Sequence, residues 1–157
     1  MNKEQTFLTA KGYHTLKEEL DHLRTVRRQQ VARRLHEALE EGDILENAEL
    51  EDARNEQAFV EGRILTLERM LRSAVIIEET GPRDTIGLGS RVTVLEVEGD
   101  ESPETYHIVG SAEADPIRGL ISNESPLGRA LMGRKVGEIA SVNAPDGVLM
   151  FQVVGIQ

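Results

Sequence analysis

The chain has 157 residues, a formal net charge of −10 and no cysteine. The acidic balance excludes general nucleic-acid binding, which needs a net basic surface, and the lack of cysteine excludes disulfides and thiolate metal sites. No apolar run approaches the roughly 18 residues of a membrane span, and the start lacks the apolar core of a signal peptide. We therefore expect a cytoplasmic protein with no membrane partner, made of one domain or two small ones.

Two long helices joined by a short turn are predicted in the first half of the chain. Apolar residues recur at helical spacing from about residue 9 to residue 40, apart from a polar gap at 27–30, and Thr9 is a candidate N-cap. A second apolar pattern repeats in steps of three and four from Leu50 to Ala74, through Gln57 and Leu71, which is typical of a coiled-coil seam. Two such helices must run antiparallel, and about 30 residues at ~1.5 Å each make a rod of ~45 Å.

Strands replace helices after Ala74. A β-branched run at 75–77 is followed by a Gly-Pro turn, and strands are predicted at 90–96, 105–110, 140–144 and 149–156. Between them, residues 125–132 predict one short helix with Ser125 as N-cap and Pro126 at its first position. The predicted fold class is therefore α+β, with an antiparallel coiled-coil hairpin over residues 1–78 and a small α+β domain over residues 79–157.

The turn between the two helices is strongly acidic. Residues 40–52 contain seven carboxylates and no basic residue: Glu40, Glu41, Asp43, Glu46, Glu49, Glu51 and Asp52. Like charges at an exposed tip repel one another until a cation binds, so a divalent cation is the simplest candidate ligand.

Asp43 and Glu46 admit two interpretations. An Asp N-cap followed three residues later by Glu forms a capping box, in which both carboxylates satisfy amide groups at the start of the second helix. Alternatively, both bind a metal ion. Mg²⁺ takes about six oxygen ligands, so two carboxylates would need a site that another molecule completes. Composition alone leaves both interpretations open.

The first predicted helix also carries a run of arginines. These residues are Arg24, Arg27, Arg28, Arg33 and Arg34. They form either an ordinary solvated face or a local basic stripe that contacts the phosphate backbone of RNA. The sequence specifies no arrangement of nucleophile and base, so we expect no independent active site and no small-molecule substrate.

Three segments of the chain, in order, resemble the bacterial Gre transcript cleavage factors, which bind RNA polymerase. The start, Leu8 to Tyr13 followed by Leu16, Glu19 and Leu20, is similar to their N-terminus. The stretch from Gly42 to Glu49, with Ala53-Arg54 and Glu61 to Ile64, is similar to their most specific motif. The tail resembles their C-terminal domain, through Ile121-Ser122, Ser125-Pro126, Ala130-Leu131, Gly133, Gly137-Glu138 and Pro145 to Gly147.

The resemblance implies an FKBP-like fold for the second domain and a function for the first. In this family the coiled coil enters the secondary channel of RNA polymerase, while the C-terminal domain holds the channel rim. The tip carboxylates help the polymerase to hold a second Mg²⁺, and the backtracked RNA is then cut internally, which restores a 3′ end in the active site. Such a protein is a cofactor in trans and not an enzyme by itself.

The resemblance also assigns roles to residues of this chain. Asp43 and Glu46 become the carboxylates that assist the metal, with the remaining Mg²⁺ ligands supplied by polymerase carboxylates, RNA phosphate and water. The tip is supported by Asn47, Glu49 and Arg54, and the polymerase anchor consists of Ser125, Pro126 and Leu127. Mg²⁺ is expected only in the complex with polymerase.

Three positions depart from the family pattern. Leu39 stands where the family usually has Arg, Leu45 where it has a polar or basic residue, and Leu50 where it has Tyr. Leu50 also fits the apolar seam, so its replacement can be explained by packing. The loss of the Tyr hydroxyl and of the Arg nevertheless removes groups that could position water or RNA, which leaves open a divergent relative that occupies the channel and inhibits without cleavage. A coiled-coil adaptor unconnected with polymerase is a third interpretation, which the match in three ordered segments opposes.

An FKBP-like fold raises the question of prolyl isomerase activity. The second predicted domain has only two aromatic residues, Tyr106 and Phe151. An aromatic-walled proline pocket needs more than these two side chains, so we expect the fold without that activity.

Overall fold

The computed structural model describes residues 5–40, 47–78, 83–99 and 102–157. The chain divides into two compact units, one formed by Met1–Gly12 with Ala74–Gln157 and the other by Tyr13–Ser73. The sequence placed a single boundary after residue 78. The structure instead groups the first residues of the chain with the second predicted domain, because the strand before the first helix pairs with the strand that follows the last helix of the hairpin.

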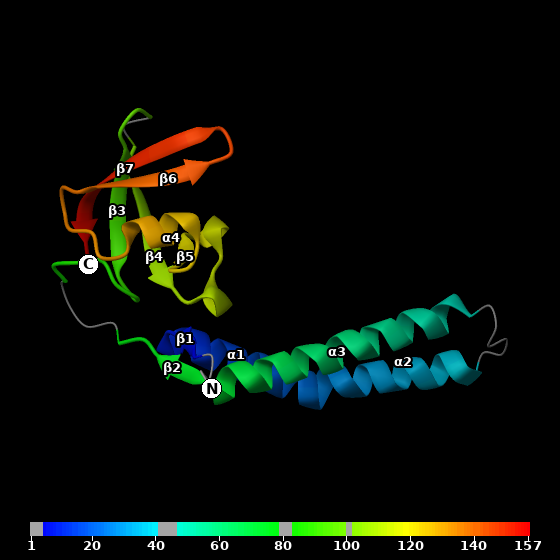
Figure 1. Cartoon of the computed structure of the whole chain (residues 1–157). Helices are drawn as coiled ribbons and strands as arrows, with labels where there is room; N and C mark the ends of the chain where they lie inside the picture. Colours follow the sequence, from blue (N-terminus) through cyan, green and yellow to red (C-terminus); the bar gives the residue numbers. More distant parts are fainter. Residues whose placement is uncertain (1–4, 41–46, 79–82, 100–101) are drawn as a thin grey trace. The chain divides into compact units, whose positions relative to one another are not determined.

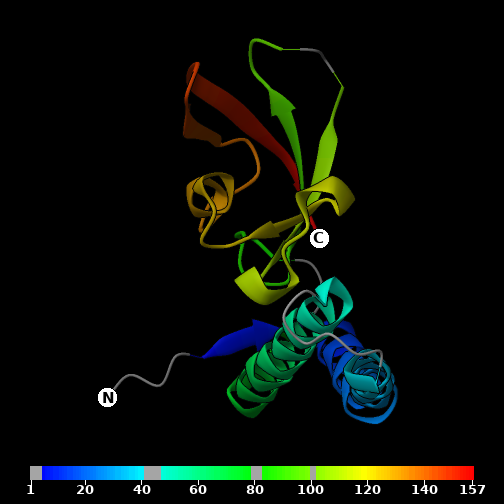
Figure 2. The ribbon, with the colours of Figure 1, turned by 90° about the vertical axis from the view of Figure 1, so that its right-hand side faces the viewer.

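Long helices make up the second unit (Figure 1). The chain runs through α1 (Ala10–His22), a π-helical turn η1 (Leu23–Arg27) and α2 (Arg28–Glu40), and later returns through α3 (Ala48–Arg72). The π turn ends at the predicted polar gap. Figures 1 and 2 show α2 and α3 side by side. The two predicted helical segments are confirmed. Within the described residues, no helix is both long enough and apolar enough to cross a bilayer.

One apolar stripe joins these helices. Its buried members are Leu16, Leu20, Leu23, Val31 and Ala38 on the first arm, and Leu50, Ala53, Val60, Ile64 and Leu67 on α3. Gln57 falls at seam spacing but is exposed, because its amide group prefers water to an apolar contact. Leu71 is half-buried and Ala74 belongs to a strand, so the stripe ends sooner than its period predicts.

A two-stranded parallel sheet joins distant parts of the chain. β1 (Thr6–Leu8) pairs with β2 (Ala74–Ile76), and the amide of Ile77 donates to the carbonyl of Leu8 over 2.7 Å. The sequence analysis missed β1, since three residues are too few to show an alternating pattern. Only the pairing with β2 identifies the segment as a strand.

Thr9 caps α1, as the sequence predicts. The amide of Gly12 donates to Thr9 Oγ1 over 3.0 Å. The carboxylate of Glu113 accepts two further hydrogen bonds, from the backbone amide of Thr9 at 2.6 Å and from its hydroxyl at 2.7 Å. A Cβ added at Gly12 would lie 2.0 Å from Glu113 Oε1, so a larger residue here would require the Glu113 carboxylate to move.

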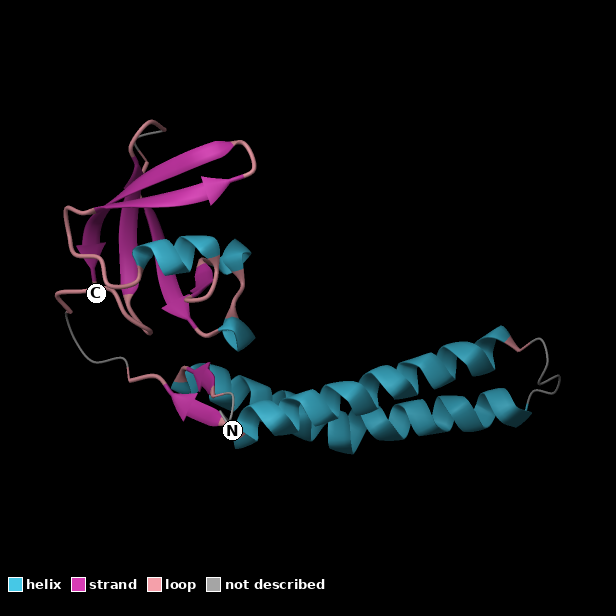
Figure 3. Ribbon diagram, in the orientation of Figure 1, coloured by secondary structure: helices cyan, strands magenta, loops and turns pink. Residues whose placement is uncertain are grey.

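A five-stranded sheet forms most of the first unit (Figure 3). Its strands are β3 (Arg91–Glu96), β4 (Glu104–Val109), β5 (Leu120–Ser122), β6 (Ile139–Ala144) and β7 (Gly147–Ile156), in the order β5-β4-β3-β7-β6. The β4–β5 pair is parallel and the other pairs are antiparallel. The four predicted strands of this sheet are confirmed, whereas β5 was missed because it has only three residues. Two 3₁₀ turns, η2 (Ser111–Glu113) and η3 (Pro116–Arg118), connect β4 to β5.

The predicted short helix is α4 (Pro126–Leu131), and it packs on one face of the sheet. Ser125 is its N-cap and accepts from the amide of Gly128 at 3.0 Å, with Pro126 in the first turn. The core beneath it consists of Ile86, Val92, Val94, Ile108, Ile121, Leu131, Ala140 and Val153. The helical hairpin and the mixed sheet together confirm the predicted α+β class.

The contact between Gly12 and Glu113 predicts an inverted effect of a glycine-to-alanine substitution. Alanine normally stabilises a helix interior by up to about 1 kcal/mol relative to glycine. Gly62→Ala in α3 should follow this rule, since an added Cβ there meets no atom within 4 Å. Gly12→Ala should instead lower the free energy of unfolding, because the Glu113 carboxylate must move away from Thr9.

Thermal and urea unfolding of both variants would measure these effects. In a Glu113→Ala background the penalty of Gly12→Ala should disappear. Equal stabilisation by Gly12→Ala and Gly62→Ala in the parental chain would show that the Glu113 contact is not a constraint.

Candidate functional site

The candidate site is the acidic turn between α2 and α3. Asp43 and Glu46, the two residues predicted to bind the metal, lie outside the described residues, as does Leu45. The structure describes both flanks of this turn, up to Glu40 on one side and from Asn47 on the other.

Asn47 connects the two flanks. Its Oδ1 accepts from the amide of Leu50 at 3.1 Å, which caps α3, and its Nδ2 donates to the carbonyl of Ala38 in the last turn of α2 at 2.6 Å. One side chain thus satisfies a free amide at the start of one helix and a free carbonyl at the end of the other. The residue next to Glu46 is held at two points.

This geometry corrects the capping interpretation of the acidic turn. The N-cap of α3 is Asn47, in an extended conformation with φ −89° and ψ 92°, and not Asp43. One of the two interpretations of the sequence made Asp43 the cap, because Asp followed by Glu matches a capping box, but Asn caps a helix equally well. The acidic first turn of α3, with Glu49 and Glu51, is the signal that places the start of the helix after Asn47.

The predicted tip-support residues have different environments. Glu49 lies in the first turn of α3, where a carboxylate is favoured by the helix dipole, and its Oε2 lies 3.5 Å from Arg34 Nη2. Arg54 is exposed one turn further along. The negative charge of Glu49 is therefore partly compensated by Arg34 on the opposite helix. The local sequence of the turn does not reveal this pair.

Ion pairs join the two arms of the hairpin along their length. Going up the first arm and down α3, the pairs are Arg24 with Glu68, Arg28 with Glu61, Arg27 and Arg34 with Glu56, and Arg34 with Glu49. From Arg24 to Arg34 the partners move from Glu68 towards Glu49, as antiparallel helices require, although Arg27 reaches Glu56 while Arg28 pairs with Glu61. Arg63 on α3 forms the reverse pair with Glu19 at 2.8 Å. Sequence reasoning missed these pairs because each joins residues 15 to 44 positions apart.

The pair of Arg28 and Glu61 is bidentate. Arg28 Nε and Nη2 each donate to one carboxylate oxygen of Glu61 over 2.8 Å. The hydrogen bond to Glu61 raises the pKa of Arg28, and the hydrogen bond from Arg28 lowers the pKa of Glu61. The hydrogen bond to Glu56 likewise raises the pKa of Arg34.

Four of the five arginines predicted to contact RNA are thus already bound to carboxylates, and Arg33 is exposed on the same arm. An RNA phosphate would have to compete with these glutamates. The RNA contact of this stripe stays a prediction.

The two described departures from the family pattern differ in burial. Leu50 is 3% exposed and belongs to the apolar stripe, so packing explains a leucine at this position. Leu39 is 47% exposed in the last turn of α2, where it adds little to the core. A loss of side-chain function relative to the family is therefore better argued for Leu39 than for Leu50.

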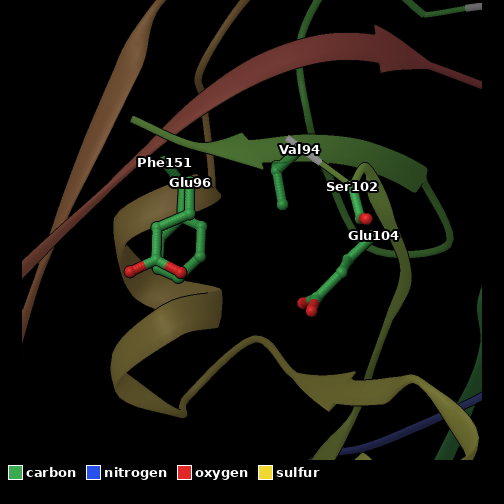
Figure 4. Close-up of a pocket in the computed structure, with 5 residues that line it drawn as sticks. All are labelled: Val94, Glu96, Ser102, Glu104 and Phe151. Carbon is green, nitrogen blue, oxygen red and sulfur yellow. The ribbon is translucent and has the colours of Figure 1, made fainter. Parts of the chain in front are cut away.

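A shallow pocket lies in the sheet domain (Figure 4). Its volume is about 80 Å³, and it is lined by Val94, Glu96, Ser102, Glu104 and Phe151. Small-molecule sites usually measure about 300–1,000 Å³ and have mostly apolar walls. Beside the pocket, burial raises the pKa of Tyr106 to about 12, and its hydroxyl donates to Glu104. A second carboxylate, Glu96, makes the pocket poorly suited to an apolar group such as a proline ring.

The predicted polymerase anchor lies at the start of α4. Pro126 is exposed, Ser125 is half-buried as the helix cap, and Leu127 packs partly against the core. Ser125 Oγ also donates to the carbonyl of Ser122 over 2.7 Å, which ties the cap to β5. The anchor residues are therefore held on a short, well-bonded turn.

The described residues contain no group of three or more His, Cys, Asp or Glu side chains that could hold a metal ion. Any metal site that uses Asp43 and Glu46 involves residues outside the described part of the chain. Their carboxylate oxygens are donors of the kind that Mg²⁺ prefers, but two of them supply fewer than its six ligands.

Comparisons with known proteins cover nearly the whole chain. Residues 6–76 match the family model "Transcription elongation factor, N-terminal", and residues 81–157 match "Transcription elongation factor, GreA/GreB, C-term". Transcription elongation factor GreA of Acetivibrio thermocellus is 50% identical over 157 residues, with 99% of this chain and 98% of the relative covered. GreA of Bacillus subtilis is 48% identical over 158 residues, with 99% of each chain covered.

Among solved structures, the GreA factor homolog 1 (Gfh1) of Thermus thermophilus is 36% identical, with 98% of this chain and 99% of that chain covered. The TM-score of this superposition is 0.45.

The double role of Asn47 predicts a graded loss of stability. Asn47→Ala should lower the free energy of unfolding by about 1 kcal/mol for the cap alone, with a further loss for the bond to Ala38. Asn47→Ser keeps a capping oxygen but no donor for the Ala38 carbonyl, so it should fall between the parental chain and the alanine variant. Urea unfolding followed by circular dichroism would measure the three proteins.

Asn55→Ala is the matched control, because Asn55 is exposed in the same helix. This control should leave stability unchanged or slightly raised, since alanine has the higher helix propensity. If Asn47→Ser proves as stable as the parental chain, the bond to Ala38 contributes nothing.

Proposed function

Because this chain belongs to the GreA/GreB family of transcription elongation factors, we propose that it inserts its helical hairpin into the secondary channel of RNA polymerase and stimulates cleavage of backtracked RNA. The observation that carries this proposal is the match to GreA relatives at about half identity along the full chain, which includes the acidic turn. The polymerase would supply the active centre, and this protein would act in trans.

The proposal assigns the chemistry to Asp43 and Glu46. When bound, Mg²⁺ would neutralise developing charge and activate water at the scissile phosphate, as in other two-metal sites. The two carboxylates would contribute oxygen ligands, and the remainder would come from the polymerase, the RNA and water. Because neither carboxylate could complete such a site alone, cleavage depends on the polymerase.

The geometry of the flanks supports this role. Asn47 fixes the chain directly after Glu46 to both α2 and α3, so the turn is anchored close to the residues that would reach the metal. Along the arms, arginines are paired with glutamates across the hairpin. Uncompensated negative charge is thereby concentrated towards the turn, where a cation would be bound.

The proposal also assigns a role to the predicted anchor at the start of α4. The exposed Pro126 and the adjacent Ser125 and Leu127 would contact the rim of the channel and hold the protein on the polymerase. This contact would leave the hairpin free to enter the channel. The exposed Leu39 supports one alternative, in which the hairpin occupies the channel but does not promote cleavage.

A stalled, backtracked polymerase complex tests the proposal directly. Purified protein and Mg²⁺ would be added to the complex, and the length of the RNA would be followed with time. Shortened RNA supports the cleavage function, and competition for the channel without shortening supports the alternative. A failure to bind polymerase would refute both.

Activity should depend strictly on polymerase. We expect no hydrolysis of RNA when the protein is incubated with Mg²⁺ alone, because the acidic turn supplies too few ligands and the sequence specifies no nucleophile. Gel analysis of labelled RNA would show this. Cleavage by a preparation proven free of polymerase would contradict the proposed mechanism.

Isosteric substitutions that remove only the charge should show that Asp43 and Glu46 assist cleavage and that neighbouring carboxylates do not. Asp43→Asn and Glu46→Gln should each reduce polymerase-dependent cleavage by at least about tenfold, while binding to polymerase is retained. Because Asn47 caps α3, neither change removes the helix cap, and thermal unfolding should be nearly unchanged.

Glu51→Gln is the matched control, since Glu51 is an exposed acidic residue in the first turn of α3. It should cleave at close to the parental rate across a Mg²⁺ titration. Parental rates for both Asp43→Asn and Glu46→Gln would show that neither carboxylate assists the metal.

A further inference from the structure

The strand β6 forms an open edge of the five-stranded sheet. The strand order ends at β6, which pairs with β7 on one side only (Figures 1 and 3). Natural edge strands are usually protected by charged side chains, proline or a bulge. The six residues Ile139–Ala144 contain no charge and no proline, and their register with β7 runs without interruption. Over these six residues the edge therefore lacks the usual protection, whereas just outside them Gly137 and Glu138 both bond Val153, and Pro145 follows Ala144.

Backbone groups of β6 are directed towards this edge. The amide of Val153 donates to the carbonyl of Glu138 over 2.9 Å. This bond shows which residues of β6 form hydrogen bonds with β7 and which do not. Because hydrogen-bonded residues alternate in such a ladder, Ile139, Ser141 and Asn143 direct their amide and carbonyl groups away from β7. These groups can bond the backbone of an added strand.

The outer face of β6 and β7 is uncharged and partly apolar. Ala140 and Val142 of β6 are buried on the side of α4, so the alternate residues point to the opposite face. Seven exposed positions make up this outer face: Ile139, Ser141, Asn143, Val148, Met150, Gln152 and Val154. None is charged, although 29% of the chain is charged, so roughly two charges would be expected among seven surface positions.

The apolar members of this face are well exposed. The exposed fractions are 47% for Ile139, 46% for Met150 and 58% for Val148, and Met150 lies opposite Ser141 in the ladder. Depletion of charge around exposed apolar side chains is the compositional mark of the centre of a protein interface. The open edge and this face are adjacent, so one partner could use both.

We infer that the β6 edge and the outer face of β6 and β7 form a second docking surface, which accepts an extended, uncharged segment of the RNA polymerase as an added strand. The inference rests on the proposed function for the identity of the partner. Strand addition supplies backbone hydrogen bonds along the edge, while alternate side chains of the added segment would cover Ile139 and Met150. A helix could not use the edge, because its backbone groups are bonded internally.

Other occupants fit the surface less well. A second copy would bring together two chains that each carry a net charge of −10. The same charge opposes an anionic membrane surface. The predicted anchor is separate, since α4 packs on the opposite face of the sheet.

Ser141→Pro is the decisive variant, because it removes an edge amide that β7 does not use and places a ring at the edge. Met150→Lys tests the outer face. Each should weaken the binding of full-length protein to purified RNA polymerase by about tenfold, equivalent to the loss of one or two net hydrogen bonds or of a buried apolar contact. Ser141→Thr and Met150→Leu are the matched controls, and both should bind like the parental chain. Circular dichroism and thermal unfolding would show that each variant is folded.

The outcomes separate the inference from the proposed function. If the parental chain binds polymerase and all four variants bind equally, the second docking surface is refuted while the proposed function stands. If the parental chain does not bind at all, both fail. Should Ser141→Pro not fold, Met150→Lys and its control decide. Sedimentation that shows a parental dimer dispersed by Ser141→Pro would assign the edge to a second copy and overturn the inference.

Discussion

The burial of one apolar stripe between two antiparallel helices is the constraint on which the hairpin depends. The stripe can be removed from water only if both arms present it to each other. This requirement sets the register between the first arm, which buries Val31 and Ala38, and α3. Once that register is set, the arginines of the first arm face the glutamates of α3. The ion pairs are thus a consequence of apolar packing, and exposed pairs of this kind contribute at most about 1 kcal/mol each.

The same register determines what the acidic turn can do. It brings the carbonyl of Ala38 within reach of Asn47, and Asn47 closes the hairpin immediately beside the predicted metal-assisting residues. Positive charge on α2 compensates glutamates along α3, and Glu49 is the acidic residue nearest the turn with such a partner among those described. A hairpin with neutralised arms and an acidic end is suited to deliver carboxylates into a site whose other ligands belong to a partner.

In the sheet domain, successive side chains of a strand point to opposite faces of the sheet, so the two faces differ in composition. Residues that face α4 form the core beneath the turn that holds Ser125 and Pro126, the predicted anchor. Residues on the other side of β6 and β7 are exposed and uncharged, and they stabilise the domain little. The proposed anchor and the proposed docking surface therefore lie on opposite faces of the sheet. Within the same unit, the carboxylate of Glu113 accepts hydrogen bonds from the amide and the hydroxyl of Thr9, the residue before α1.

The sequence by itself determined the helices, the main strands and the caps at Thr9 and Ser125, because these depend on periodicity and on residues within one turn of each other. It also indicated the family and the acidic turn. The tertiary structure decided β1 and β5, which are too short to carry a pattern, and the partners of the arginines, which lie 15 or more residues away. It also placed the cap of α3 at Asn47 and excluded the interpretation of Asp43 as the cap, since both residues suit a cap and only the position where the helix begins distinguishes them. Local patterns encode local bonds, whereas contacts between distant segments exist only after the apolar stripe and the sheet have formed.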